Sequence, residues 1–152
     1  MKPNDRILEH PPKVSLLIRR LAWFRYNLRR FLRFSERATR ERGLTPQQYV
    51  LLLGVAGYTG RGWATISELA EFLQERHNAV VGLVQRASTR GLVHKDQGGR
   101  DRRFVRVRLT RRGATALSGL AALHLQELER IQLDLGKALK ARPKFLEAEK
   151  GA

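Results

Sequence analysis

The chain has 152 residues, the length of one ordinary domain, and a hydrophobic share of 42%, which suits a packed core. It contains no cysteine, which excludes disulfides, thiolate metal sites and thiol-based redox sensing. Its net charge of +16 is concentrated in two blocks: residues 13–42 carry ten basic and two acidic groups, and residues 97–112 carry seven arginines and one aspartate. Such blocks favour a polyanionic partner, first of all nucleic acid, through counterion release.

Several other classes of function have no support in the sequence. No apolar run approaches the roughly 20 residues that cross a bilayer, and the N-terminus lacks an apolar signal region, so we expect a cytoplasmic protein without a membrane partner. The four histidines are too scattered for a metal-ligand pair, and we expect neither a metal site nor a cofactor. No catalytic triad, carboxylate pair or phosphate-binding glycine loop stands out, so the sequence predicts no catalytic residues and no enzyme.

The first element is one long helix. Residues 1–12 read as an irregular arm, and residues 13–43 as a helix whose apolar positions recur at spacings of three and four. A helix of roughly thirty residues is too long for a domain of this size to cover alone. A partner chain is the simplest way to bury its apolar stripe.

Residues 44–109 carry the signals of a helix-turn-helix followed by a wing. Residues 45–48 start one helix with a capping box, and residues 57–62 contain three glycines that break the chain into a loop. Residues 65–68 start a short helix with a second capping box. Another helix is predicted from about residue 77 to 89, and two short helices across a tight turn make a helix-turn-helix.

A β-hairpin is predicted next. Residues 92–95 read as a short strand, residues 97–103 as a basic, glycine-led loop, and residues 104–109 as the returning strand. The returning strand alternates strictly, with Val105, Val107 and Leu109 on one side and Phe104, Arg106 and Arg108 on the other. An apolar face of this kind anchors the strand and directs its guanidinium groups outward, as in the wing of a winged helix.

Thr110 is predicted to cap a second long helix over residues 110–142, followed by a tail at residues 143–152. The expected fold class is therefore mainly α with a small β-hairpin. Residues 44–109 would form a winged helix-turn-helix that binds DNA. The long helices at 13–43 and 110–142 would flank this region.

The second helix of the helix-turn-helix presents a polar face suited to the major groove. Its amides, Asn78 and Gln85, would pair with adenine, and Gly82 would let the helix backbone approach the groove closely. Free backbone N–H groups at its start favour a phosphate. The alternative is a merely solvated face. The predicted contacts of this helix are Arg76, His77, Asn78, Val81, Gly82 and Gln85.

The tip of the wing carries Arg100, Arg102 and Arg103. Arginine suits a narrow minor groove, because its charge is weakly hydrated and the groove potential is negative. Asp101 would pair with a neighbouring arginine and hold it in position. The alternative is that this loop only connects the two strands.

In this order and spacing the motifs resemble those of the MarR-type winged-helix transcription regulators. Over residues 44–113 the resemblance is carried by sequence motifs. For the flanking helices it is carried by their position along the chain. Its pieces are Leu44-Thr45-Pro46-Gln47-Gln48-Tyr49, Thr65-Ile66-Ser67-Glu68-Leu69-Ala70, Arg90-Gly91-Leu92-Val93, Asp101-x-Arg103 and Val107-x-Leu109-Thr110-x-x-Gly113. The chain departs from the family at Gly82, where members often have a polar or basic residue, and at Ala87, where they usually have leucine.

The resemblance implies an obligate homodimer in which the long helices at 13–43 and 110–142 form the dimerisation region. It also implies binding to double-stranded DNA at a pseudo-palindromic operator. The leading hypothesis is a sequence-specific regulator that acts as a repressor. It implies that Arg103 contacts the minor groove and that Asp101 orients this arginine. The alternative function is an architectural protein that binds nucleic acid by charge with little sequence preference.

The resemblance also raises the question of a small aromatic or phenolic effector, because many MarR-like proteins release DNA when such an acid binds. Trp23, Tyr26, Arg30 and Tyr49 are the candidate ligand-binding residues, since aromatic walls with a cationic anchor suit a phenolic carboxylate. Two other interpretations stay open. The aromatic residues would instead form dimer core, or the basic block at 13–42 would extend the DNA footprint.

Overall fold

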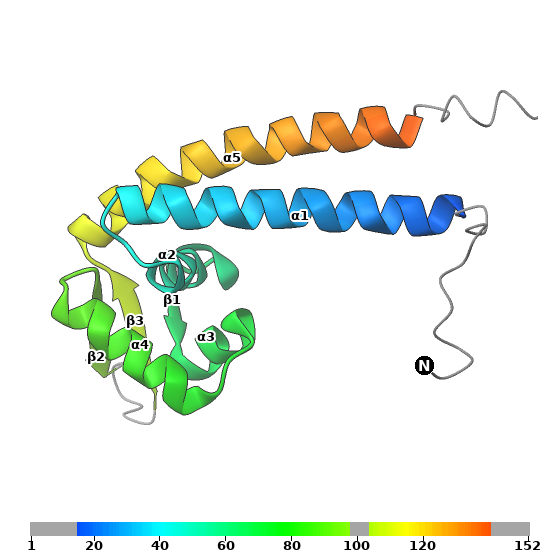
Figure 1. The fold of residues 1–152 in the computed structure, drawn as a ribbon. Helices are drawn as coiled ribbons and strands as arrows, with labels where there is room; N and C mark the ends of the chain where they lie inside the picture. The colour runs from blue at the N-terminus through cyan, green and yellow to red at the C-terminus, as the bar shows by residue number, and fades with distance from the viewer. Residues whose placement is uncertain (1–14, 98–103, 141–152) are drawn as a thin grey trace, which may run out of the picture. The chain divides into compact units, whose positions relative to one another are not determined.

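The computed structural model describes residues 15–97 and 104–140, and of residues 97 and 133–140 the backbone alone. In these ranges the fold is mainly α with a small antiparallel sheet, as predicted (Figure 1). The elements in chain order are α1 (Leu16–Glu41), α2 (Pro46–Leu53), a π-helical turn η1 (Gly54–Tyr58), β1 (Trp63–Thr65), α3 (Ile66–Leu73), α4 (His77–Thr89), β2 (Val93–Gln97), β3 (Val105–Leu109) and α5 (Arg111–Lys140).

The chain divides into two compact units. One comprises the start of α1, up to Leu32, and the end of α5, from Leu128. The other is Arg33–Glu127 and contains the remaining elements. These boundaries fall inside the two long helices, and the assignment of residues 13–43 and 110–142 to dimerisation stays a prediction.

Within the first unit, α1 carries a stripe of exposed apolar side chains at spacings of three and four: Leu17, Leu21, Phe24, Leu28 and Leu32. The hydroxyl of Ser15 accepts a hydrogen bond from the N–H of Ile18 at 3.3 Å, at the start of the helix. The long N-terminal helix expected from the sequence is therefore present, and its apolar stripe lies open in the single chain.

Both capping boxes form as the sequence predicts. In α2, the N–H of Gln48 donates to the Thr45 hydroxyl and the N–H of Thr45 donates to the Gln48 side chain, each at 3.1 Å. In α3, Thr65 and Glu68 make the same reciprocal pair. These contacts satisfy backbone donors that a helix start otherwise leaves unpaired, and they fix where each helix begins.

The sheet has one strand more than the predicted hairpin. Its order is β1-β3-β2, with both pairs antiparallel. β1 follows the loop predicted at residues 57–62, at positions where no strand was predicted, and it adds to β3 with Ala64 opposite Val107. A strand of three residues shows too little alternation to be recognised without its partner, which lies about forty residues further along the chain.

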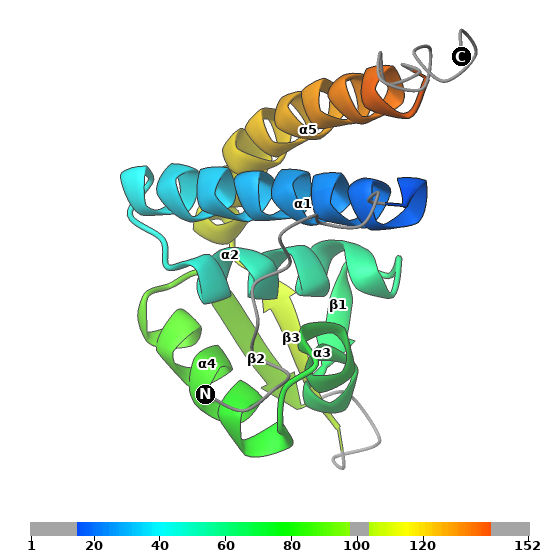
Figure 2. The ribbon, with the colours of Figure 1, turned by 45° about the vertical axis from the view of Figure 1, so that its right-hand side comes forward.

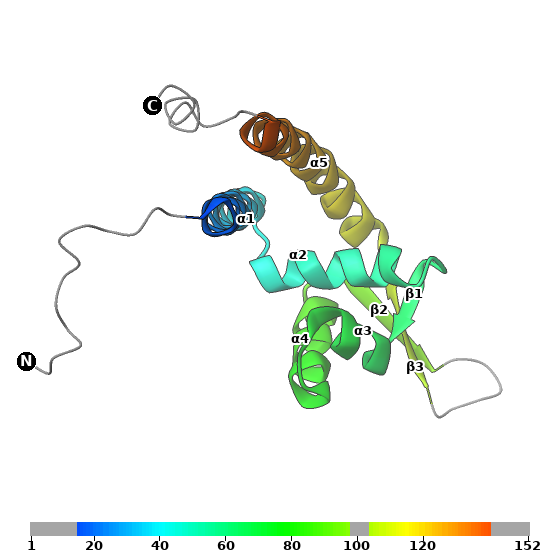
Figure 3. The same cartoon turned by 90° about the vertical axis from the view of Figure 1, so that its right-hand side faces the viewer.

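The helix-turn-helix packs on one face of this sheet. α3 and α4 lie on the same side of the strands (Figure 2 and Figure 3). Val80, Val84 and Ala87 of α4 and Val107 of β3 are buried in the shared core. The predicted alternation of β3 is confirmed at its centre, where Val107 is buried and Arg108 is exposed.

The start of α5 is fixed to the end of the helix-turn-helix. Thr110 caps α5 as predicted, because its hydroxyl accepts a hydrogen bond from the N–H of Gly113 at 3.0 Å. The same hydroxyl donates to the carbonyl of Gly91 at 2.6 Å. A Cβ on Gly113 would lie 2.0 Å from the Leu92 carbonyl oxygen, so only glycine permits this close approach.

Candidate nucleic-acid interface

Helix α4 buries one face and leaves the opposite face to solvent. Val80, Leu83, Val84 and Ala87 are buried, as the sequence predicts. The exposed residues of this helix and its N-cap include the predicted DNA contacts Arg76, His77, Asn78, Val81 and Gln85, and also Arg86. The geometry thus places these predicted residues on one accessible helix. It does not test their contact with DNA, which stays a prediction.

Gly82 does not leave the open space that its lack of a side chain suggests. An added Cβ would lie 3.2 Å from Nη1 of Arg86, so the guanidinium group of Arg86 lies beside the glycine. Sequence reasoning missed Arg86, although its position four residues after Gly82 places the two on the same helix face. A DNA groove that approaches Gly82 would therefore meet a cationic side chain there.

Lys95 of β2 joins this surface and was also missed. Its ammonium group donates a hydrogen bond to the side-chain oxygen of Gln85. In the sheet, Lys95 pairs with Val107, so its side chain lies on the face that α4 covers. This pairing register turns Lys95 toward α4, where its side chain reaches Gln85. The contact depends on strand pairing, so no local sequence signal predicts it.

Arg90 holds the C-terminal end of α4 in place. It donates to the Gln48 side-chain oxygen and to the Gly43 carbonyl, both at 2.7 Å. These bonds tie α4 to the start of α2 across more than forty residues of sequence. Arg90 therefore positions the candidate recognition helix, and its guanidinium group is already engaged within the protein.

The outer face of the sheet carries an aromatic residue among arginines. The guanidinium carbon of Arg61 lies 3.9 Å from the centre of the Trp63 ring, and that of Arg106 lies 4.7 Å from it. Cation–π contacts of this kind link β1 to β3. On the same face, Nε of Arg108 donates to Asp96 at 3.1 Å.

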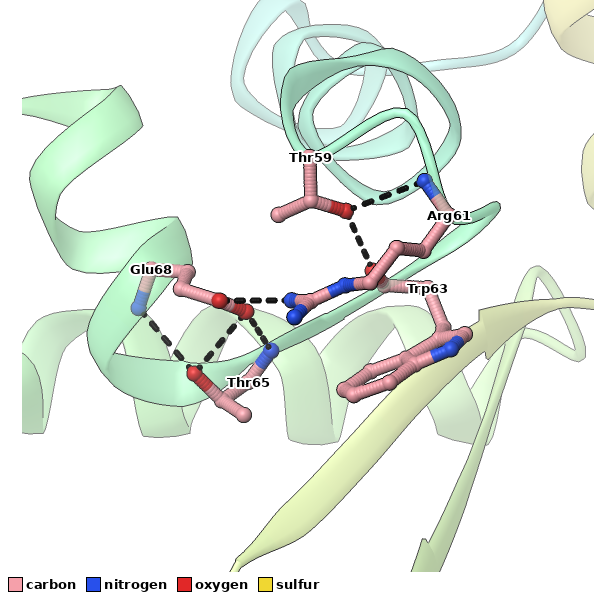
Figure 4. Close-up of polar contacts among 5 residues, drawn as sticks. All are labelled: Thr59, Arg61, Trp63, Thr65 and Glu68. Atoms are coloured by element: carbon pink, nitrogen blue, oxygen red, sulfur yellow. Dashed lines mark hydrogen bonds and ion pairs between the residues drawn. The ribbon is translucent and has the colours of Figure 1, made fainter.

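Glu68 connects this cluster to the start of α3 (Figure 4). One of its carboxylate oxygens pairs with Arg61 at 2.5 Å, and the other accepts a hydrogen bond from the N–H of Thr65 at 2.8 Å. The backbone hydrogen bond from Thr65, followed by the contact with Arg61, holds the pKa of the Glu68 carboxyl below its usual value. Arg61 is consequently neutralised by a neighbour.

The predicted minor-groove residues, Arg100, Asp101, Arg102 and Arg103, lie outside the described residues. The strands that flank them are in place, since Gln97 pairs with Val105 at the last described position of the hairpin. The role of these four residues stays a prediction.

A groove lies between α2 and α4, beside the outward face of α4. It has a volume of about 430 Å³, within the usual range for small-molecule sites. Its lining includes apolar residues of α2, α3 and α4 together with one cationic and one acidic residue: Pro46, Val50, Leu73, Ala79, Leu83, Arg86 and Glu75.

The four candidate effector residues have different surroundings. Trp23 and Tyr26 are exposed on α1 and stack on each other with ring centres 5.2 Å apart. Arg30 belongs to the same unit, whereas Tyr49 belongs to the other. Tyr49 is buried and stacks on His124 at 4.4 Å, and burial raises the pKa of its hydroxyl. A shared ligand site for these residues stays a prediction.

Metal-binding groups and membrane-spanning helices were both sought within the described residues. Among them, no group of three or more histidine, aspartate or glutamate side chains is arranged to hold a metal ion. None of the helices within residues 15–97 and 104–140 is long and apolar enough to span a membrane.

No protein-family model and no curated protein sequence matches the chain. Several solved structures, in contrast, match most of the chain. AbsC, a MarR family transcriptional regulator from Streptomyces coelicolor, is 21% identical with a TM-score of 0.65, over 89% of this chain and 88% of AbsC. A mutant of MepR from Staphylococcus aureus bound to an oligodeoxyribonucleotide is 17% identical with a TM-score of 0.61, over 86% and 89% of the two chains.

BpsR from Bordetella bronchiseptica, whose DNA binding is regulated by 6-hydroxynicotinic acid, is 19% identical with a TM-score of 0.56. The match covers 94% of this chain and 99% of BpsR. The chain therefore has the MarR-type winged-helix fold, as the sequence motifs predicted.

Proposed function

We propose that this protein is a sequence-specific regulator of transcription that binds double-stranded DNA, and that it acts as a repressor. The observation that carries the proposal is the outward face of α4, which combines amides, a small apolar side chain and cations on an exposed helix beside a wing. Amides and cations read base edges and phosphates in the major groove. The fold shared with DNA-binding regulators supports the same function.

The regulator acts as a homodimer on a pseudo-palindromic operator. The stripe on α1 supports this, because five large apolar side chains at helical spacing lie exposed in the single chain. An exposed apolar stripe of this regularity marks a protein interface. Two copies related by a twofold axis would present two α4 helices to successive major grooves.

Selection of bound duplexes from a random pool tests this function. The expected result is an enriched pseudo-palindromic motif, with half-sites about 10 base pairs or a multiple of that apart. A pool that retains its random composition after several rounds would contradict sequence-specific recognition. It would instead favour an architectural protein that binds by charge.

A small aromatic acid is the effector class that we propose. The regulation of BpsR by 6-hydroxynicotinic acid supports the class, and the groove between α2 and α4 supports a location, because Arg86 supplies a cation beside apolar walls. The second location is on α1, at Trp23, Tyr26 and Arg30. A ligand in either place would release DNA only if it favoured a different arrangement of the two recognition helices.

Calorimetric titration of the DNA-free protein with 6-hydroxynicotinate and benzoate separates the two locations. Arg86→Ala should abolish binding in the α2–α4 groove, and Arg30→Ala should abolish binding at α1. Absence of binding to the wild-type protein with both acids would contradict an effector of this class.

A further inference from the structure

Gln85 is held by a cation from a different element. Its side chain lies exposed on α4, and the ammonium group of Lys95 on β2 donates a hydrogen bond to its side-chain oxygen. Lys95 is exposed as well. The two residues are ten positions apart in sequence and form one polar unit at the junction of the recognition helix and the wing.

The chemistry of lysine fixes the orientation of the Gln85 amide. An ammonium group has three donors and no acceptor, so the amide must turn its oxygen toward Lys95. Its NH₂ group then points away from the lysine, with two donors available. The ammonium takes one of the two lone pairs of the oxygen and places positive charge beside the other.

This orientation opposes the adenine pairing that glutamine alone would favour. Bidentate recognition of adenine needs the amide oxygen to accept from the N6 amino group while the NH₂ donates to N7. A cation beside the oxygen repels the amino group of adenine. Guanine instead offers two acceptors, O6 and N7, which suit a unit that presents only donors.

We propose that Lys95 and Gln85 act together as a donor unit that selects guanine at the base pair facing Gln85 in each half-site. Gln85 contacts the base, and Lys95 determines specificity by orienting the amide and supplying charge. This inference rests on the proposed function and replaces the expectation that Gln85 reads adenine. At the base pair that faces Gln85 it predicts guanine, whereas the sequence alone suggested adenine.

The test is a random-pool selection with the wild-type protein and three variants. Gln85→Ala identifies the position that Gln85 reads, since the base preference should disappear there and remain elsewhere. In the wild-type motif that position should be guanine, preferred over adenine by about 5-fold to 150-fold, which is the usual discrimination of a good bidentate contact.

Lys95→Met keeps the length of the side chain and removes its charge and donors, so the preference at that position should shift toward adenine. Lys95→Arg is the matched control. It retains charge and donors and should keep guanine. Circular dichroism of each variant checks that the fold is intact, which is expected because both side chains are exposed.

Three results would overturn the inference. Adenine at the Gln85 position of the wild-type motif contradicts it directly. An unchanged base preference in Lys95→Met, with affinity lowered equally for all sequences, would make Lys95 a phosphate contact only. An absence of any enriched motif with the wild-type protein would overturn the proposed function and this inference together, whereas the first two results leave the proposed function standing.

Discussion

The arginines differ from one another in their partners within the folded protein. In the sequence they are seen only as blocks of positive charge. Arg90 is bonded to Gln48 and to the Gly43 carbonyl, and Arg108 is paired with Asp96. Arg86 instead lies along the outward face of α4. Net charge therefore indicates the class of partner, and the position of each side chain decides which cations are available to a phosphate.

Glu68 gives a prediction at the same scale. Glu68→Gln keeps the capping contact with Thr65, since Gln48 fills the equivalent position in α2, but it removes the charge that pairs with Arg61. The folded-state pKa of Glu68 is lowered, so the stability that its charge contributes is present at neutral pH. That stability is lost as the pH falls below the unfolded value of 4.5 and through the folded-state pKa.

Urea unfolding at pH 7 and at about pH 3 measures this contribution. Wild type should exceed Glu68→Gln in free energy of unfolding by about 1 kcal/mol or less at pH 7, because the ion pair is partly exposed. The difference should shrink toward zero at the lower pH. An equal difference at both pH values would show that the charge of Glu68 contributes nothing.

The elements show what local sequence does and does not determine. The starts of α2, α3 and α5 were predicted, because Thr45, Thr65 and Thr110 cap them within three residues. β1 and the contact of Lys95 with Gln85 were not, because both depend on the pairing of segments distant in sequence. The pairing register of β3 with β1 and β2 therefore cannot be predicted from the local sequence of any one strand.

The junction between the sheet and α5 gives a prediction at the scale of elements. Gly113→Ala places a methyl group against the backbone carbonyl of Leu92, which has no flexible side chain to move aside. Chemical denaturation should show a loss of about 1–3 kcal/mol or more. Gly57→Ala is the control, because nothing lies within 4 Å of its added Cβ, and it should change stability by about 0.5 kcal/mol or less.

Equal effects of the two alanine substitutions would contradict the close approach at Gly113. A large effect confined to Gly113 would explain why glycine closes the motif Val107-x-Leu109-Thr110-x-x-Gly113. The motif then has a physical meaning within this chain, since it allows α5 to start directly against the strand that follows α4.

At the scale of the whole molecule, the exposed stripe on α1 predicts self-association. Leu21→Glu introduces a charge into the stripe and should weaken the dimer by about 2 kcal/mol or more for each copy, since a leucine loses its burial. Arg33→Glu places a glutamate at an exposed position outside the stripe and should leave the dimer intact. Sedimentation equilibrium at micromolar concentration measures the mass of each protein.

A monomeric wild-type protein, or equal masses for the two glutamate variants, would contradict a dimer built on this stripe. Where Leu21→Glu lowers solubility, the thermal midpoint of the wild-type protein gives a second measurement. It should rise with protein concentration if folding and association are coupled.

Sequence-specific recognition of duplex DNA is tested most directly by one ratio, the affinity for a selected operator divided by the affinity for a scrambled duplex of equal length at one fixed salt concentration. A regulator should give a ratio of about 10³ or more. A ratio near one, with affinity that falls steeply with salt for both duplexes, would contradict the proposed function and indicate binding by charge alone.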